Sequence, residues 1–245
     1  MLWFFQDPLY LAVTLIGLAL TLWAQFKVKS NFARYSRVGV RSGMTGAEAA
    51  AAVCRAGNAH GVKIERHQGF LTDHYDPRSK TLRLSPEVYD GTSVASVAVG
   101  AHEAGHSIQD AVAYPMLGFR TNIVTAANIG NRLWPMPFVF GLMLAYGQQE
   151  VQRSGWGLGQ VLMATGILLF AAVVLFQLVT LPVEYDASRR AKAVLAQTGI
   201  VQTQEEARGV SKVLDAAART YVAAALAGIL QLVYMIARLH QSDRH

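Results

Sequence analysis

Charged residues are scarce in this sequence of 245 residues. Only 16% are Asp, Glu, Lys or Arg, whereas about 25% is usual in soluble domains. The shortage of charge, together with 52% hydrophobic residues, excludes an ordinary water-soluble protein. Cysteine is almost absent: the single Cys54 excludes an internal disulfide and fits a reducing compartment. Because no nucleic-acid-binding motif occurs either, we attribute the net charge of +6 to contact with anionic lipid and predict no nucleic-acid partner.

The missing charges leave four long uncharged stretches: Pro8–Phe26, Leu133–Gln149, Ser154–Val183 and Thr220–Ala237. A helix needs about 20 residues to cross the hydrocarbon core of a bilayer. We therefore predict about four transmembrane helices, at residues 1–30, 121–148, 154–183 and 220–238. The first stretch has neither a basic residue before it nor a small-residue cleavage site, so we expect a retained anchor and not a signal peptide.

Lysine and arginine predict the orientation of these spans, because loops on the cytoplasmic side are enriched in both. They cluster behind the first and the third stretch, at Lys27, Lys29, Arg34, Arg37 and Arg41, and at Arg189, Arg190 and Lys192. We therefore place residues 31–120 and 184–219 in the cytoplasm and both termini outside. Arg238 and Arg244 follow the last stretch and run against this pattern.

The predicted cytoplasmic region 31–120 carries signals of both helix and strand. Thr45 and Glu48 form a capping-box pattern, which predicts a helix that continues to about Asn58. Val62–Arg66 and Thr81–Leu84 alternate apolar and polar residues, as half-buried strands do. Asp73–Ser79 is rich in turn-forming residues, so we expect a turn there.

A five-residue motif, His-Glu-Ala-Gly-His, lies at positions 102–106. Residues four apart share one face of a helix, so His102 and His106 can bind one zinc ion. Glu103, beside the first histidine, is placed to accept a proton from a water molecule at that ion. The alternative is two surface histidines on an ordinary helix.

The sequence before the motif favours the zinc site over this alternative. Thr92 or Ser93 is a suitable N-cap, and no charge falls between them and His102, which predicts a buried helix. Gly100 and Gly105 are poor helix formers. Their position within the helix predicts that another segment approaches closely.

Two families of zinc proteases are disfavoured by what surrounds the motif. Metzincins continue it to a glycine and a third histidine, but Gln109 and Val112 stand at those places. Intramembrane proteases of the site-2 type need an Asp-Gly pair in a later span, whereas Asp90-Gly91 precedes the motif.

The third ligand must therefore come from another part of the chain. Glu184 directly follows the third span, and two crossings after His106 return it to the same side of the membrane. Asp186 would point to the opposite side of the same helix and is a poorer candidate. His67 and His74 are the other candidate ligands.

Substrate binding has candidates just before the motif. A peptide can add to the edge of a sheet, so we expect the predicted strand of Thr81, Leu82, Arg83 and Leu84 to be an edge strand that binds substrate backbone. The oxyanion formed during peptide hydrolysis needs a second donor besides the metal. His74, Tyr75 and Arg189 are all candidates for that donor.

Three runs carry a resemblance to a known family: Ala101–Asp110, Asp73–Ser85 and Leu181–Ala191. In these runs, and over nearly its whole length, the chain resembles the YugP-type neutral zinc metallopeptidases, which are integral proteins of bacterial membranes. The resemblance implies a gluzincin-like site with His102, His106 and Glu184 as zinc ligands and Glu103 as the catalytic acid and base.

The resemblance also indicates which residues orient the ligands. Many gluzincins carry an aspartate four residues after the ligand glutamate, but here Ser188 stands at that place. A hydroxyl can still hydrogen-bond to a ligand, although more weakly. Asp110, one turn past His106, is a second candidate for that role.

These observations combine into one expectation. We predict a mostly α membrane protein with about four transmembrane helices and a small cytoplasmic α+β zincin-like domain. It would be a multi-pass zinc metalloendopeptidase of the bacterial cytoplasmic membrane, cleaving peptides or proteins, membrane proteins among them, in quality control or processing. The alternatives are a membrane scaffold or chaperone partner with a vestigial zinc site and, with Arg132 as an intramembrane charge, a transporter. An intact Glu103 argues against the scaffold, because metal binding alone does not need it. The transporter is disfavoured because only one span would carry such a charge.

Overall fold

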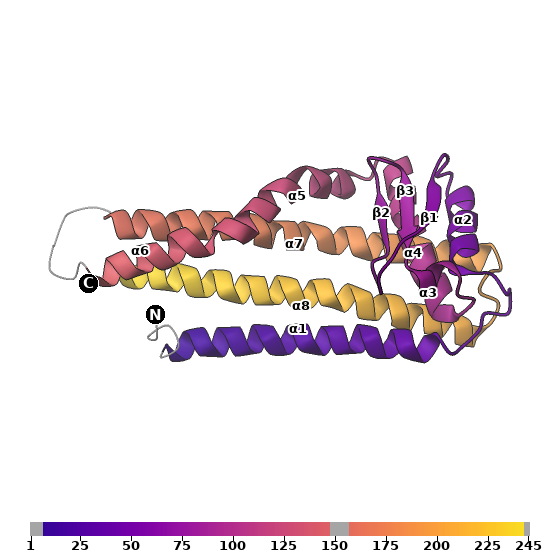
Figure 1. Ribbon diagram of the computed structural model, residues 1–245, viewed down its shortest axis with the longest axis horizontal. Helices are drawn as coiled ribbons and strands as arrows, with labels where there is room; N and C mark the ends of the chain where they lie inside the picture. The colour runs from indigo at the N-terminus through magenta and orange to yellow at the C-terminus, as the bar shows by residue number, and fades with distance from the viewer. Residues whose placement is uncertain (1–6, 148–156, 243–245) are drawn as a thin grey trace. The chain divides into compact units, whose positions relative to one another are not determined.

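The computed structural model describes residues 7–147 and 157–242, which form a mostly helical chain with one small sheet (Figure 1). The expected starts of the first and third spans, at residues 1 and 154, and the end of the second at residue 148 lie outside the described residues. The helices are α1 (Pro8–Tyr35), α2 (Gly46–Ala56), α3 (Pro86–Tyr89), α4 (Val94–Ala111), α5 (Pro115–Leu133), α6 (Pro135–Gly147), α7 (Leu158–Gln197) and α8 (Gln204–Ser242). The strands are β1 (Lys63–Arg66), β2 (His74–Asp76) and β3 (Thr81–Leu84).

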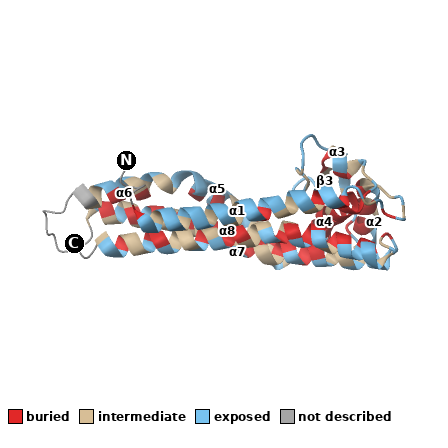
Figure 2. Ribbon diagram, turned by 90° about the horizontal axis from the view of Figure 1, so that it is seen from below, coloured by how far each residue is buried: buried red, intermediate tan, exposed pale blue. Residues whose placement is uncertain are grey.

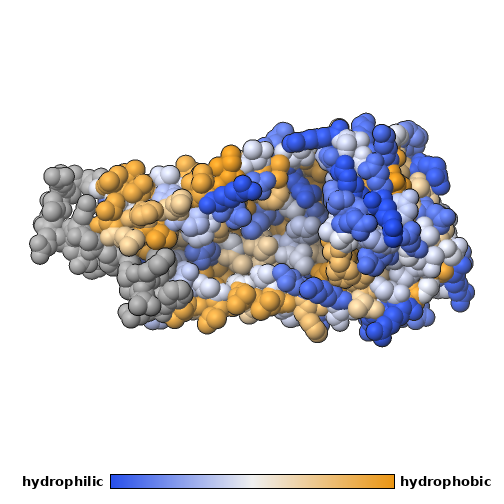
Figure 3. Space-filling model, viewed as in Figure 1, coloured by the Kyte–Doolittle hydropathy of each residue, from blue (hydrophilic) through white to orange (hydrophobic). Residues whose placement is uncertain are grey.

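Three of these helices, α1, α7 and α8, are long and apolar enough to cross a membrane. The second expected span, residues 121–148, is not one continuous helix: the structure divides it between α5 and α6. Within the described residues it contributes only a shorter apolar helix, Pro135–Ala145. Large apolar side chains such as Leu15, Leu18 and Leu168 are exposed, and apolar residues gather over the helices in Figure 3. Exposed leucines of this density are expected where hydrocarbon, and not water, surrounds a helix.

The chain forms two compact units. The first comprises Met1–Leu22, Phe119–Val179 and Val222–His245, and the second Trp23–Gly118 and Thr180–Tyr221. The first unit has its own apolar core, which includes Phe138, Leu142, Met163, Phe170 and Met235. The core of the second unit includes Val53, Leu82, Leu84, Val97 and Leu195.

An ion pair joins the first and the last segment of the first unit. The carboxylate of Asp7 pairs with Arg238, and it accepts a hydrogen bond of 2.8 Å from the hydroxyl of Tyr234. Asp7 also accepts a hydrogen bond from the backbone of Leu9 at the start of α1. Arg238 is one of the two residues that run against the expected charge pattern, and Asp7 neutralises it. The other, Arg244, lies outside the described residues.

The sheet has the strand order β1-β3-β2, with β3 parallel to β1 and antiparallel to β2. The expectation that Thr81–Leu84 is an edge strand is therefore wrong, because β3 is paired on both sides. Leu82 and Leu84 are fully buried, which explains the alternation that the sequence shows. The expectation of a turn throughout Asp73–Ser79 is also wrong, because His74–Asp76 is the strand β2. The turn comes only after Asp76, whose carboxylate accepts hydrogen bonds from the backbone of Arg78 and the hydroxyl of Ser79.

Local capping signals behave as the sequence predicts. The capping box of Thr45 and Glu48 is present at the start of α2, which confirms that helix. The side chain of Ser93 accepts from the backbone of Ser96 and begins α4. The helix α4 is buried on nearly all sides, as Figure 2 shows, and this confirms the expected buried helix.

Two glycines let other backbone segments approach α4. A Cβ atom on Gly100 would lie 2.3 Å from the carbonyl oxygen of Gly46 in α2. A Cβ atom on Gly105 would lie 2.5 Å from the carbonyl oxygen of Ala187 in α7. Real Cβ atoms do not approach backbone so closely, so the contacts of α4 with α2 and with α7 both require glycine. This confirms the predicted close approach.

The contact at Gly105 generates the first prediction. Gly105→Ala should force α4 and α7 apart and destabilise the protein by about 1–3 kcal/mol, the usual cost of overpacking. Gly118→Ala in α5 is the matched control, because a Cβ there meets no atom within 4 Å. It should be neutral or stabilise by up to about 1 kcal/mol, since alanine is the better helix former. Thermal unfolding in detergent measures both variants, and an unchanged Tm for Gly105→Ala would contradict the close packing.

Candidate metal centre

The second unit brings three metal-binding side chains together. Helix α4 supplies His102 and His106, and α7 supplies Glu184. Their candidate donor atoms all lie within 4.8 Å of one another. All three residues are at least nine-tenths buried, and Glu103, beside His102, is buried as well. The structure therefore groups Glu184, and neither His67 nor His74, with the two histidines.

The distances within this group suit a tetrahedral ion. The Nε2 atoms of His102 and His106 lie 3.1 and 3.7 Å from the Oε2 atom of Glu184. Ligands at about 2.0–2.1 Å from zinc are separated by about 3.3 Å along the edge of a tetrahedron, and the two distances bracket this value. Two imidazoles and one carboxylate are also the donor set of many catalytic zinc sites, which keep the fourth position for water or substrate. The residues thus fit zinc in both number and chemistry.

Each histidine is held through its other ring nitrogen. The Nδ1 atom of His102 lies 3.1 Å from the hydroxyl of Ser188, four residues after Glu184 on α7. The Nδ1 atom of His106 lies 3.0 Å from the amide oxygen of Gln109. Such partners fix the ring orientation of a metal ligand, and they leave both Nε2 atoms facing Glu184.

Gln109 is the site residue that sequence reasoning missed, because there it served only to exclude metzincins. Its position three residues after His106, on the same helix face, was the available signal. Asp186 was underestimated for a related reason. It is not among the three grouped donors, but it is buried and contacts Gln109, Arg189 and Arg190.

Asp110 was a candidate for orienting a histidine ligand, but its side chain contacts Tyr75 instead. It accepts a hydrogen bond of 2.8 Å from the hydroxyl of Tyr75 and thereby fastens β2 to the end of α4. Burial and this bond to Asp110 raise the pKa of the Tyr75 hydroxyl, which therefore stays protonated at neutral pH. The proton of Tyr75 is directed to Asp110, although Tyr75 was a candidate oxyanion donor.

The remaining candidates for substrate or oxyanion binding have other partners. The Nδ1 atom of His74 lies 2.8 Å from the carbonyl oxygen of Thr72, and Arg189 pairs with Asp186. In β3, Arg83 is half-buried and pairs with Asp76. The other three residues of that strand are buried: Thr81, Leu82 and Leu84.

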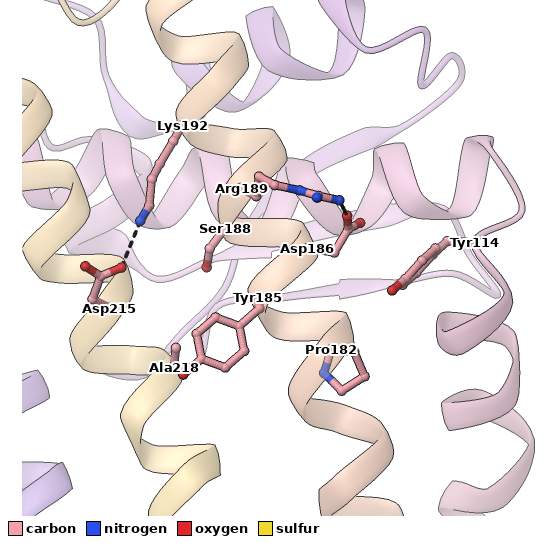
Figure 4. Close-up of a pocket in the computed structure, with 9 residues that line it drawn as sticks. All are labelled: Tyr114, Pro182, Tyr185, Asp186, Ser188, Arg189, Lys192, Asp215 and Ala218. Atoms are coloured by element: carbon pink, nitrogen blue, oxygen red, sulfur yellow. Dashed lines mark hydrogen bonds and ion pairs between the residues drawn. The ribbon is translucent and has the colours of Figure 1, made fainter.

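A pocket of about 540 Å³ lies beside Ser188, the residue that contacts His102. Tyr185, Ser188 and Arg189 of α7 line it together with Asp215 of α8 (Figure 4). Lys192 and Asp215 form an ion pair of 2.8 Å across it. None of the three grouped donors lines this pocket, but Ser188, which contacts His102, does.

Comparison with known proteins shows which family the chain resembles over most of its length. Residues 10–240 match a family described as "Putative neutral zinc metallopeptidase". The chain is 42% identical over 228 residues to the "Putative membrane protease YugP" of Bacillus subtilis (strain 168), which covers 93% of this chain and 95% of the relative. No solved structure matches.

The geometry of the three donors predicts one zinc ion per chain. Elemental analysis of protein purified without chelator should find near-stoichiometric zinc, and the His102→Ala/His106→Ala double variant should lose it. The His67→Ala/His74→Ala double variant removes the same number of imidazoles outside the group and should keep zinc. Chelation should lower the Tm of the wild-type protein, because the ion links α4 to α7. Equal zinc in the two double variants would contradict the site.

Proposed function

This chain belongs to the neutral zinc metallopeptidase family, and from that premise we propose that it is a membrane-bound zinc endopeptidase that uses His102, His106 and Glu184 as ligands. The observation that carries the proposal is the convergence of these three buried donors next to Glu103. When bound, zinc acidifies water and polarises the scissile carbonyl. The chain itself supplies the orientation of the ligands and the groups that move protons.

Glu103 is the proposed catalytic acid and base. It accepts a proton from the attacking water and then delivers that proton to the leaving amine. Its burial on α4 favours this role, because a carboxylate in a water-poor site is a stronger partner for developing charge. A scaffold with a vestigial zinc site would need the ligands but not Glu103, so hydrolysis is the better account of the site.

The proposed substrates are proteins at the cytoplasmic face of the bacterial membrane. The helices α1, α7 and α8 support a multi-pass arrangement, to which Pro135–Ala145 would contribute a fourth crossing. The basic residues that follow the first stretch, among them Lys27 and Arg34, favour the cytoplasmic side for the metal centre. A protease held there meets loops and unfolded segments of membrane proteins, which supports a role in quality control or processing.

Because β3 is the central strand, it cannot bind a substrate backbone by strand addition, and β2, at the edge of the sheet, is the better candidate. In the described residues β2 is paired only with β3, so its other edge is available for an added strand. Tyr75 fastens β2 to Asp110, one turn beyond His106. We therefore propose that substrate adds to the free edge of β2 and runs past the metal centre.

The first test of this function is Glu103→Gln. Glutamine preserves the size of the side chain but cannot act as a base at neutral pH, so peptide hydrolysis should fall by at least about 100-fold. Zinc content should be unchanged, because Glu103 is not a ligand. Cleavage of an unfolded protein such as casein in detergent, followed against zinc content, checks both statements. Activity close to that of the wild-type protein would refute the catalytic role of Glu103.

The second test concerns β2. Successive residues of an added strand alternate in their backbone hydrogen bonds, so N-methylation of a peptide substrate should raise KM at every second position. Each lost bond should cost about 0.5–1.5 kcal/mol, or roughly two- to tenfold in KM. Side-chain changes at the same positions serve as controls and should act more mildly. A series of N-methylated peptides with uniform KM values would rule out strand addition.

A further inference from the structure

Gln109 is a fully buried side chain that connects α4 to α7. Its amide nitrogen donates to the carbonyl oxygen of Val183 at 2.8 Å and to the carboxylate of Asp186 at 3.0 Å. Both partners only accept hydrogen bonds, since Asp186 is ionised beside two arginines. The amide therefore has one allowed orientation, in which the nitrogen faces α7 and the oxygen faces His106.

This orientation determines the tautomer of His106. The amide oxygen of Gln109 can only accept, so Nδ1 of His106 must carry the proton that bridges the 3.0 Å between them. The lone pair of the ring is then on Nε2, the atom 3.7 Å from Glu184. A neutral imidazole with a free Nε2 is the form that binds a metal ion.

Asp186 adds charge to this contact. Arg190 contacts its carboxylate at 2.5 Å, and Arg189, the preceding residue of α7, also pairs with it. An amide that donates to a carboxylate becomes a better acceptor at its oxygen, because hydrogen bonds in a buried chain polarise one another. His102 has a different arrangement, since its partner is the neutral hydroxyl of Ser188.

We propose that Gln109, polarised by Asp186, is the positioning residue of His106: it selects the zinc-binding tautomer and strengthens the Nε2 atom as a ligand. This inference rests on the zinc site proposed above. It assigns a function to Asp186 that depends on Gln109 and not on direct contact with the metal.

Gln109→Met removes the amide and keeps the size of the side chain. Zinc affinity, measured by competition with a chromogenic chelator, should fall about 10–100-fold, as is typical for partners of metal-bound histidines. In the cobalt-substituted protein the ring Nδ1–H signal of His106 should disappear through solvent exchange, while that of His102 stays. Ser107→Ala is the matched control, because Ser107 is buried on the same helix and hydrogen-bonds to Ala104 and Cys54 but not to a ligand. It should leave zinc affinity unchanged.

Exchanging the amide and the carboxylate between positions 109 and 186 tests whether Gln109 acts by orienting His106 or only by packing. Gln109→Glu alone places two carboxylates side by side and should weaken zinc binding strongly, and Asp186→Asn alone should weaken it several-fold. The double variant restores one acceptor for His106 and one donor from residue 186, so it should bind zinc more tightly than Gln109→Glu.

Wild-type zinc affinity and ring-proton signal in Gln109→Met, or a double variant no better than Gln109→Glu, would overturn the inference. Because zinc affinity is read without substrate, a protein that binds zinc but cleaves no peptide would refute the proposed peptidase function and leave this test intact.

Discussion

The close approach of α4 to α7 at Gly105 is the contact on which the candidate metal centre depends. With no side chain at Gly105, the backbone of Ala187 reaches α4 directly. Ala187 lies between Asp186 and Ser188 and one turn after Glu184, so the same contact sets the depth of all three side chains relative to the histidines. A larger residue at 105 would move them together, because α7 is a continuous helix there. The positions of these polar side chains thus depend on a contact between two backbones.

The polar contacts of His102 and His106 further restrict the orientation of the two rings. Ser188 and Gln109 each contact one Nδ1 atom, and both side chains are buried. A buried polar group without a partner is costly, so these contacts also restrict α4 and α7 to one relative rotation. Asp186 extends the restriction to the arginines of α7. The arrangement of the site and the stability of the second unit therefore depend on the same few bonds.

The helices α1 and α7 each belong partly to one compact unit and partly to the other. In α1 the first part belongs to one unit and the part from Trp23 onward to the other, and in α7 the division falls between Val179 and Thr180. Glu184 therefore lies in the same unit as the histidines, a few residues after an apolar segment. This placement is what makes a protease that acts close to a membrane surface a physically reasonable proposal, since the metal-binding helix continues from a candidate span.

The sequence by itself determined the features that depend on neighbours along the chain. The capping box at Thr45 and the shared helix face of His102 and His106 follow from spacing, which fixes local geometry whatever the tertiary structure. The burial of α4 was predictable from its lack of charge before His102. The sequence named Glu184 as a candidate ligand, but only the tertiary structure grouped it, and neither His67 nor His74, with the two histidines. Only the tertiary structure decided that β3 is the central strand and that Gln109 connects His106 to Asp186. Strand order and contacts between helices depend on how distant segments pack against each other. A side chain such as Asp186, which helical phase alone directs away from the site, acquires its role from the neighbour that packing supplies.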